Sequence, residues 1–529
     1  TAITTGDDNT SVGYKAGYAL TTGTNNVLIG GNAGDAITTG TDNVALGRAS
    51  LTSDTLGQSS VAIGHQALFS QNFTSATHAY NVAVGKNAGL ALSTGVYNTL
   101  IGGLAGDAIT TGSNNASLGH LSLSANTTGG SNVALGAYAL YSNTTASDNT
   151  AVGKNALFVN TTGADNVAVG ASSLDANTTG ASNTGIGRSA LGANTTGTRN
   201  SALGASALAA NTTGNYNTAV GFQSLDASTT GTHNTALGDA SLSANTTANY
   251  NTAVGQSALF ANTTGANNVA VGALALLANT TGAANTAVGK GALDANTTAN
   301  SNTAIGDTAL GANTTGAENV AVGVNALDAN TTGASNVAVG QGALDTNTTA
   351  NNNTAVGHDS MKSNTTGAEN VAVGKGALNA NTTASNNTAV GRSALLANTT
   401  GAQNTAVGQG AGASNTTGAS LAAFGRQALE GNTTGDRNTA VGERALFVNT
   451  TADNNTGIGY FALGANTSGF ANTAIGSQAG DALTTGNNNI AVGVNALGAD
   501  TLGDRSIAIG NEALLAQNFT SSTDVYNVA

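Results

Sequence analysis

Four side chains that could bind a sugar or a protein receptor recur at every seventeenth position: Arg199, Tyr216, His233 and Tyr250. If equal positions of successive repeats stack about 4.8 Å apart, as neighbouring strands do, these residues form one column, the aromatic ladder. Aromatic rings and a cation in such a column can stack on a sugar ring or contact a receptor. The alternative is that they are ordinary turn residues or pack between chains. The aromatic ladder is therefore a candidate surface-binding site.

Other candidate surface-binding residues combine an aromatic ring with the same spacing or with the one irregular segment of the repeat. That segment, residues 71–80, is four residues longer than its equivalents and is nearly repeated at 517–526. It is either a loop that displays recognition residues or a bulge that sets the register. The candidates are the pairs Tyr80 with Tyr97 and Tyr141 with Phe158, together with Phe73 and His78 in the long turn.

Two carboxylates show the same spacing, at Asp328 and Asp345. Stacking would place them about 5 Å apart, the separation that retaining glycosidases use. However, Lys362 follows in the same column, and the column is expected to be an outward ridge, so we predict no catalytic residues. The His residues share no metal-ligand spacing and no calcium-binding repeat occurs, so neither a metal site nor a cofactor is predicted.

The element that must position these residues is a repeat marked by glycine. From Gly13 to Gly510, glycine recurs at every seventeenth residue with a single four-residue slip between Gly64 and Gly85. A fixed repeat of this length indicates coils that stack on one another. We number each coil from its Asn, so that residues 149–165 are positions 1 to 17 and the glycine is at position 5. Frequent β-branched residues and glycines, and the lack of an apolar stripe with a 3.6-residue period, argue against helices. The sequence therefore predicts an all-β parallel β-solenoid with two short strands and two turns per coil.

The repeats themselves predict which positions face inward. Position 2, which holds Thr or Val, and position 4, which holds Val, Ile or Leu, are expected to face the core, as is the usual Leu at position 9, whereas the variable position 10 faces outward. Five coils carry Gly at position 9 and a Leu or Ile at position 12, which is usually Asn, so both positions are expected to fill the same volume. Gly412 lacks this exchange, which predicts a small cavity or a local distortion. The invariant Gly at position 5 is expected to need a positive φ or to have no room for a Cβ, whereas position 15 tolerates Ala. Asn at positions 1 and 12 recurs in register and should form hydrogen-bonded columns of side-chain amides.

Composition limits the classes of function. The chain of 529 residues has a formal net charge of −13 and no Cys, Pro or Trp, which argues against a nucleic-acid partner and excludes disulfides. The longest nearly apolar stretch, residues 269–278, is about half the ~20 residues that span a bilayer, so no membrane insertion is predicted in this segment. The repeat predicts one continuous array over residues 1–529. Because it starts in mid-repeat, and because the segment 60–74 nearly recurs at 506–520, we expect a fragment of a longer fibre protein.

Each coil offers a thin core, with about one Val, one Leu and a few small residues. Positions 3 and 8 are mostly Ala, which would let another backbone approach closely. The sequence therefore predicts lateral association of identical chains, which share a core between them.

Three segments carry a resemblance to known families: Ser60-Val-Ala-Ile-Gly64, Asn166-Val-Ala-Val-Gly170 and Ser506-Ile-Ala-Ile-Gly510. They resemble the head repeat of YadA-like trimeric autotransporter adhesins, and with Ala-Leu and Asn-Thr-Thr-Gly added they are similar to repeats of bacteriophage tail fibres. The resemblance implies a left-handed β-roll, three chains wide, in an extracellular fibre at a cell or virion surface that binds a host-surface glycan or protein receptor without enzymatic activity. The adhesin repeat is shorter than the seventeen-residue coil of this chain. The alternatives are a purely structural filament or sheath, an ice-binding solenoid and a glycan-hydrolysing tailspike.

Overall fold

The computed structural model describes residues 5–519, 521–524 and 526–529, which form short β-strands joined by turns. The coils belong to two compact units, one up to Ala266 and one from Asn267. In the part of the chain that the structure describes, no helix is present that could cross a membrane. The all-β parallel solenoid predicted from the sequence is confirmed.

The strands of the first unit are β1 Thr10–Val12, β2 Val27–Ile29, β3 Val44–Leu46, β4 Gly57–Gln58, β5 Val61–Ile63, β6 Thr77–His78, β7 Val82–Val84, β8 Thr99–Ile101, β9 Ala116–Leu118, β10 Val133–Leu135, β11 Thr150–Val152, β12 Val167–Val169, β13 Thr184–Ile186, β14 Ser201–Leu203, β15 Thr218–Val220, β16 Thr235–Leu237 and β17 Thr252–Val254. Those of the second unit are β18 Val269–Val271, β19 Thr286–Val288, β20 Thr303–Ile305, β21 Val320–Val322, β22 Val337–Val339, β23 Thr354–Val356, β24 Val371–Val373, β25 Thr388–Val390, β26 Thr405–Val407, β27 Ala422–Phe424, β28 Thr439–Val441, β29 Thr456–Ile458, β30 Thr473–Ile475, β31 Ile490–Val492, β32 Gly503–Asp504, β33 Ile507–Ile509 and β34 Thr523–Asp524.

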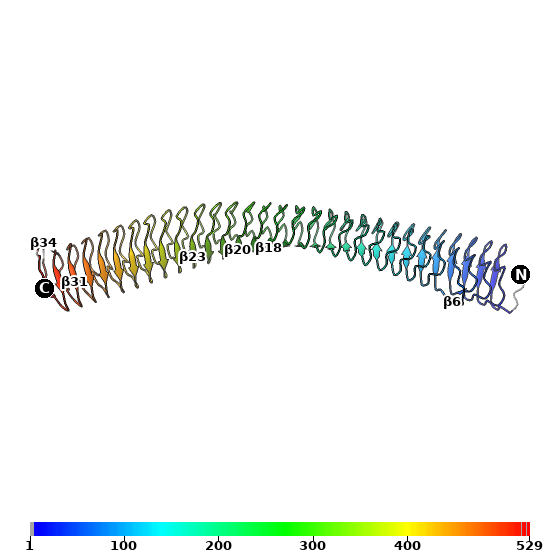
Figure 1. The fold of residues 1–529 in the computed structure, drawn as a ribbon, viewed down its shortest axis with the longest axis horizontal. Helices are drawn as coiled ribbons and strands as arrows, with labels where there is room; N and C mark the ends of the chain where they lie inside the picture. Colours follow the sequence, from blue (N-terminus) through cyan, green and yellow to red (C-terminus); the bar gives the residue numbers. More distant parts are fainter. Residues whose placement is uncertain (1–4, 520, 525) are drawn as a thin grey trace. The chain divides into compact units, whose positions relative to one another are not determined.

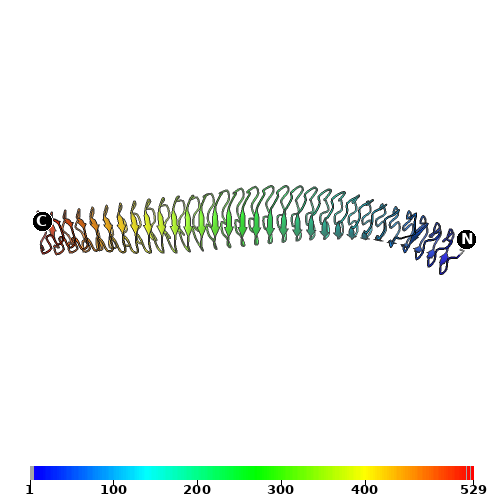
Figure 2. The ribbon, with the colours of Figure 1, turned by 60° about the horizontal axis from the view of Figure 1, so that its bottom comes forward.

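Within each unit the three-residue strands pair in parallel with the strand of the next coil (Figures 1 and 2). The register equals the repeat: Thr150 of β11 lies opposite Val167 of β12, and Val167 lies opposite Thr184 of β13. Backbone bonds also join the turns of neighbouring coils, for example from the Leu174 nitrogen to the Ala190 oxygen at 3.0 Å. Equal positions of neighbouring coils therefore lie side by side.

The strand faces the core through its middle residue, not through its ends. In every three-residue strand after β1 the middle residue is buried, whereas its two neighbours are partly or largely exposed. Ala202 is 1% exposed, for example, but Leu203 beside it is 50% exposed. The predicted inward orientation of positions 2 and 4 is therefore wrong. The interior beside the strand is narrow, and in most coils the small side chain of Ala at position 3 fills it.

The rest of the coil is turn, and the predicted second strand is absent from the regular coils that the structure describes. In the coil of residues 149–165, three residues other than glycine have a left-handed backbone: Asn155, Leu157 and Asp165, with φ of 60°, 51° and 59°. A leucine rarely adopts this conformation. Here it directs the fully buried Leu157 side chain into the core, as predicted for position 9. Position 10 is partly exposed, which agrees with its predicted outward orientation.

The exchange between positions 9 and 12 is confirmed by burial. Where position 9 is Gly, the apolar residue at position 12 is at most 1% exposed: Leu20, Ile37, Leu92, Ile109 and Leu483. A Cβ on Gly106 would lie 2.7 Å from Cδ1 of Ile109, so the two side chains cannot occupy the site together. At Gly412 the backbone is not distorted, since its φ of 59° matches that of Gly480. Cδ2 of Leu395 from the preceding coil lies 3.0 Å from the place of its missing Cβ.

The glycine at position 5 is needed for both of the predicted reasons. Gly170 has a φ of 133°, a region open almost only to glycine, and a Cβ on it would lie 2.6 Å from the oxygen of Gly187 in the next coil. Position 15 has no positive φ in these coils and accepts Ala146 and five other alanines, each 4–5% exposed. Only the glycine at position 5 is therefore fixed by backbone conformation.

Asparagine forms two buried columns, as predicted. At position 1, Asn183 donates its backbone N–H and its side-chain amide to Oδ1 of Asn166, at 3.0 and 3.2 Å, and its amide also donates to the Gly197 oxygen. At position 12, the amide of Asn177 donates to Oδ1 of Asn160 at 2.8 Å. Buried polar groups cost little free energy when they are paired in this way. The Ala residues at positions 3 and 8 are buried in the core of their own chain. The prediction that they let the backbone of another chain approach is therefore wrong.

The column at position 12 is interrupted by Ser228. Its hydroxyl and Oδ1 of Asn211 in the preceding coil are both buried without a hydrogen-bond partner. We expect Ser228→Asn to restore the amide bonds and to raise the free energy of local opening of this coil by about 1–2 kcal/mol. Hydrogen exchange of the Thr229 amide measures this value. Ser182→Asn, an exposed change to a residue common at position 17, should leave it unaltered, and equal effects of both variants would contradict the prediction.

The long turn at 71–80 is anchored by a polar network inside the coil. Asp54 accepts hydrogen bonds from the Gln71 amide at 2.7 Å and from the backbone N–H of Gly57 and Phe73. Burial raises the pKa of the Asp54 carboxyl above its usual value. The same network recurs at the second long turn, where Gln517 donates to Asp500 at 2.7 Å. The turn also carries β6, which pairs with β4. The buried part of the turn therefore sets the register between these two coils, whereas the tip of the turn lies in solvent.

Candidate surface-binding sites

The aromatic ladder forms as a continuous stack in the first unit. The rings of Tyr216 and His233 lie 4.8 Å apart between centroids, those of His233 and Tyr250 lie 4.9 Å apart, and both pairs are inclined by only 19°. The Arg199 guanidinium lies 5.3 Å from the Tyr216 ring centroid and donates to the Tyr216 hydroxyl. All four side chains are exposed. The column therefore presents the edges of three stacked rings to solvent, with a cation over the ring at one end.

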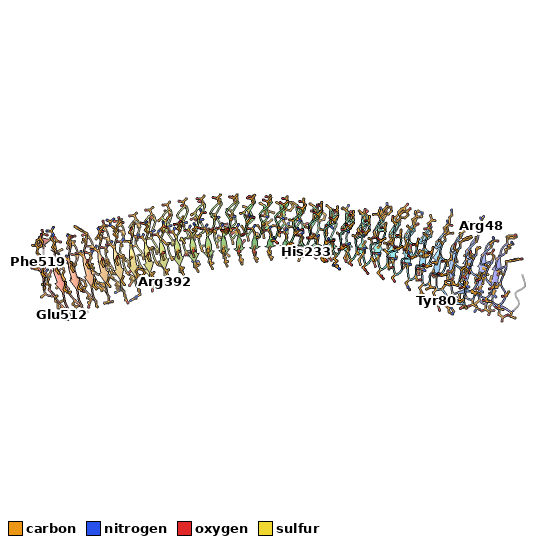
Figure 3. All side chains as sticks on the ribbon, viewed as in Figure 1. Arg48, Tyr80, His233, Arg392, Glu512 and Phe519 are labelled. Atoms are coloured by element: carbon orange, nitrogen blue, oxygen red, sulfur yellow. The ribbon has the colours of Figure 1, made fainter. Side chains whose placement is uncertain are left out.

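The backbone beneath the aromatic ladder holds the rings in place. Each of the four side chains stands on a residue with a left-handed φ of 57–59°, which points it outward from the turn. The backbone N–H of Tyr216 donates to the Thr198 oxygen at 3.2 Å, and that of Tyr250 donates to the Thr232 oxygen at 3.1 Å. The ladder is thus built on hydrogen-bonded coils, and Figure 3 shows His233 on the outside of the ribbon.

A second stack lies at the long turn. Tyr80 stacks on Tyr97 at 5.9 Å and on His78 at 5.6 Å, and the two tyrosines are more than half exposed. His78 also contacts Oγ of Ser59 through Nδ1 at 3.1 Å. Phe73, in contrast, is only 5% exposed. It packs beneath the turn, so its prediction as a surface-binding residue is wrong. The aromatic content of the turn did not reveal which of its rings anchor it.

The pair Tyr141 and Phe158 belongs to a larger aromatic cluster. Their rings stack at 5.3 Å, and Tyr138 contacts both edge-on at 5.9 and 6.2 Å. His120 in turn lies edge-on to Tyr138 at 5.7 Å. Sequence reasoning missed Tyr138 and His120. The spacing of three residues from Tyr138 to Tyr141, across the buried Leu140, is the signal that could have found the first of them.

Asp328 and Asp345 lie one coil apart and are partly buried. Burial raises the pKa of the Asp328 carboxyl, and the negative charges of Asp345 and Asp294 raise it further. Burial also raises the pKa of Asp345, although the Lys362 charge acts in the opposite direction. Lys362 forms its ion pair with Asp359 at 3.2 Å. The column is thus a row of half-buried carboxylates along the coil surface.

Across residues 5–519, 521–524 and 526–529, no group of three or more His, Asp or Glu side chains could hold a metal ion. The fold and the surface stacks define the class of this protein: a parallel β-solenoid repeat protein with stacked aromatic side chains on its outer face. No protein-family model matches the chain, and no curated protein matches it either.

Proposed function

We propose that the chain forms a homotrimeric, left-handed β-solenoid fibre that serves as the shaft or head of an extracellular attachment protein. The resemblance of its Val-Ala-Ile-Gly segments to YadA-like adhesin heads and phage tail fibres supports this setting at a cell or virion surface. In this role the fibre carries binding residues and catalyses no reaction. The observation that carries the proposal is an uncovered apolar face on the strands.

The apolar face consists of position 4, which is Val, Ile, Leu or Phe in every three-residue strand, together with position 2 in the coils that carry Val or Ile there, whereas most other coils carry Thr at position 2. All of the three-residue strands are uncharged, and in both units they expose large side chains such as Leu203, Leu237 and Ile475, which are 40–50% exposed. A contiguous exposed apolar surface of this kind marks an interface. The partner must carry apolar groups with the same spacing over many coils, and another copy of this chain does so. Closed symmetry about one axis then lets three copies bury their faces together.

The mass of the chain in solution tests the assembly. We expect three times the 50.9 kDa of one chain by analytical ultracentrifugation. Leu203→Glu combined with Leu237→Glu would bring carboxylates into the interface, which is unfavourable by several kcal/mol. The temperature at which the trimer mass is lost should then fall by at least about 5 °C.

Thr196→Glu with Thr230→Glu is the matched control, because these exposed threonines have the same separation but lie at position 14, away from the strands. The control should keep the parental dissociation temperature. A parent chain that is monomeric at all concentrations, or equal shifts for both double variants, would rule out the strand face as the interface.

The aromatic ladder is the part of the fibre that we propose for adhesion. Each stacked ring contributes about 0.5–1.5 kcal/mol beyond its buried area, so the loss of three rings should lower adhesion at least about tenfold. Serine already occupies position 17 at Ser182 with a φ of 59°, so Tyr216→Ser, His233→Ser and Tyr250→Ser preserve the turn. We expect the triple variant to keep its melting temperature and to lose binding to cells that the parent binds.

Tyr460→Ser, which removes a half-exposed ring at position 6 of the second unit, is the control and should bind normally. Unchanged adhesion of the triple variant would assign the rings to packing between chains. A purely structural filament or sheath is the second candidate function. The same exposed apolar face favours it, and a trimer that binds no cell surface would support it.

A further inference from the structure

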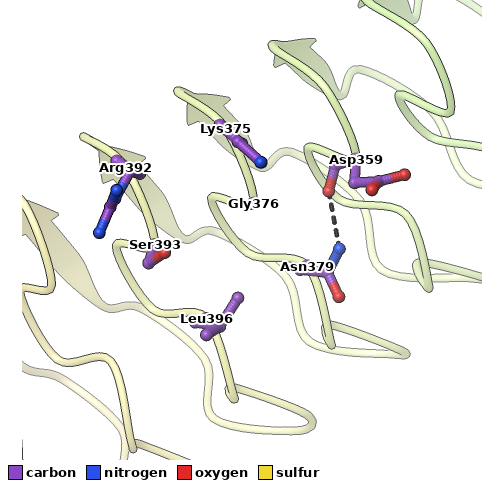
Figure 4. A pocket seen from close by; sticks show the side chains of 7 residues that line it. All are labelled: Asp359, Lys375, Gly376, Asn379, Arg392, Ser393 and Leu396. Atoms are coloured by element: carbon purple, nitrogen blue, oxygen red, sulfur yellow. Dashed lines mark hydrogen bonds between the residues drawn. The ribbon is translucent and has the colours of Figure 1, made fainter.

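A shallow hollow of about 350 Å³ lies on the second unit, on the surface formed by positions 6, 7 and 10 (Figure 4). It opens where position 7 is Gly376, because the neighbouring coils carry the side chains of Asp359 and Ser393 at the same position. A Cβ on Gly376 would meet only Leu396, at 3.5 Å, so the space above this glycine is empty of other protein atoms. We call this hollow the Gly376 notch. Its size is at the lower end of the range for small-molecule sites, which suits a single sugar ring.

Two cations stand on one side of the Gly376 notch. Lys375 and Arg392 follow strands β24 and β25, and both side chains are exposed. Among the residues that the structure describes, neither of them forms an ion pair. In Figure 4 their charged ends point apart, Lys375 toward Asp359 and Arg392 away from Gly376. Both are long, exposed side chains one coil apart, so rotation about their side-chain bonds can bring both groups to one ligand carboxylate.

Three other lining residues, Asp359, Asn379 and Leu396, supply different chemistry. The Asn379 amide donates to the Asp359 backbone oxygen at 2.9 Å, which fixes the amide at the wall. The Asp359 carboxylate already pairs with His358 at 3.0 Å and with Lys362 at 3.2 Å, and it can accept further hydrogen bonds from hydroxyls. Leu396, which is 39% exposed, offers an apolar surface for the carbon skeleton of a ring. Inorganic phosphate has no carbon skeleton to pack on Leu396, whereas a sugar ring has both an apolar face and several hydroxyls that can donate to Asp359.

The notch lies in a locally basic stretch of an acidic chain. Between His358 and Arg426 the chain carries four cations, Lys362, Lys375, Arg392 and Arg426, against two carboxylates, Asp359 and Glu369, although the formal net charge of the whole chain is −13. An anionic ligand is therefore attracted here and repelled from most of the remaining surface.

From this combination we infer that the Gly376 notch binds a carboxylate-bearing pyranose, that is, a sugar residue of the uronic acid type. Lys375 and Arg392 bind the carboxylate, Asp359 accepts hydroxyl hydrogen bonds and Leu396 packs against the ring. The site is built from neighbouring coils of one chain, so it depends neither on the trimer nor on the aromatic ladder.

The test titrates the full chain with methyl glucuronoside and with methyl glucoside, which differ by the carboxylate, and follows ligand NMR signals. We expect the glucuronoside to bind with a Kd on the order of 1 mM and the glucoside at least about tenfold more weakly. Lys375→Gln and Arg392→Gln, which introduce the residue found at Gln341 and Gln409, should each weaken glucuronoside binding about tenfold. Gly376→Asn should abolish it by filling the notch, and the fold should persist because Asn325 occupies the same position with a φ of 54°.

Lys290→Gln is the matched control. Lys290 also precedes a position-7 glycine, Gly291, but Asp294 and Asp307 lie in the same and the next coil. Its replacement should leave the Kd unchanged. Equal losses for Lys290→Gln and Lys375→Gln would reduce the effect to unspecific attraction, and equal affinity for inorganic phosphate or for the glucoside would overturn the sugar assignment. Absence of glucuronoside binding at 20-fold the expected Kd, about 20 mM, would overturn the site itself.

Discussion

Replacement of Gly170 by Ala is expected to open the stack at its coil and to lower the local free energy of unfolding by about 3 kcal/mol or more. Two effects add. The φ of 133° belongs to a region that residues with a Cβ almost never occupy, and the new Cβ would lie 2.6 Å from the Gly187 oxygen and 2.7 Å from its carbonyl carbon. Both obstructing atoms are backbone atoms, so no side-chain rotation relieves the overlap. Position 15 tolerates a similar overlap in coils that carry Ala, so the positive φ is the effect that sets Gly170 apart. Because coils interact mainly with their neighbours, the loss should be local, and hydrogen exchange of the amides around residue 170 measures it.

Gly180→Ala, ten residues later in the same coil, is the control. It reproduces the arrangement at Ala146, an alanine at position 15 whose neighbours in the column, Gly129 and Gly163, are both glycines. A Cβ on Gly180 would also come close to a backbone oxygen, 2.4 Å from that of Gly197, but Gly180 has no positive φ, and the natural alanines at position 15 show that the turn accommodates this contact. We therefore expect a change within about 1 kcal/mol. If Gly180→Ala were as damaging as Gly170→Ala, the special role of position 5 would be refuted.

A negative charge in the position-1 asparagine column is expected to have the second large effect. Asn115 donates its backbone N–H to Oδ1 of Asn98, and its side-chain amide donates to the same atom and to the Gly129 oxygen, each at 3.1 Å. Asn115→Asp replaces the donor with an oxygen that faces both acceptors, and the site is only 1% exposed. Burial of a carboxylate against acceptors should lower the local free energy of unfolding by about 3–5 kcal/mol at pH 7.

This variant should also respond to pH in a defined direction. Burial raises the pKa of such a carboxyl in the folded state above its unfolded value, as it does for Asp54. The folded variant is then relatively more stable at acid pH, and it loses stability as the pH rises through the folded pKa. Hydrogen exchange at several pH values, corrected for intrinsic rates, measures this change.

The preceding residue provides the control, because Asn114 is exposed at position 17, where Asp148 and Asp165 occur naturally with φ near 60°. Asn114→Asp should be nearly neutral at every pH. A deficit of Asn115→Asp that grew on acidification would contradict the argument.

The repeat, the coil length and the amide columns could all be predicted, because they depend only on which residues recur at the fixed interval of the repeat. The phase of the strand could not. A Thr-Ala-Val strand alternates equally well with either face inward, and the usual preference for large apolar residues in the core pointed to Val. The structure places Ala151 inside and leaves Val152 partly exposed. The conformation of the turn decides which face of the strand points inward. In this turn Leu157 adopts a left-handed φ, which leucine disfavours, so the sequence contained no indication of the turn conformation.

The candidate sites divide in the same way. Stacking of Tyr216, His233 and Tyr250 followed directly from the register, since equal positions must become neighbours. Contacts across different positions, such as Tyr138 with Phe158, depend on how the turn folds and were missed. The burial of Phe73 has the same cause, because it results from the polar network around Asp54. The Gly376 notch exists because Gly376 has no side chain, and its shape depends on where the neighbouring side chains lie, which the sequence does not show.

Paired strands are offset by one whole repeat, so the length of the solenoid is set by the number of its coils. Each coil bonds its neighbour through the same backbone groups and the same asparagine amides, so a genetic duplication or deletion of one whole coil rejoins groups that already match. Every such event changes the length by a single strand spacing, about 4.8 Å, whereas a change of another number of residues keeps the columns aligned only if a turn absorbs it, as the long turn does between β5 and β7. Evolution can thus adjust the reach of the protein in countable increments without designing a new contact.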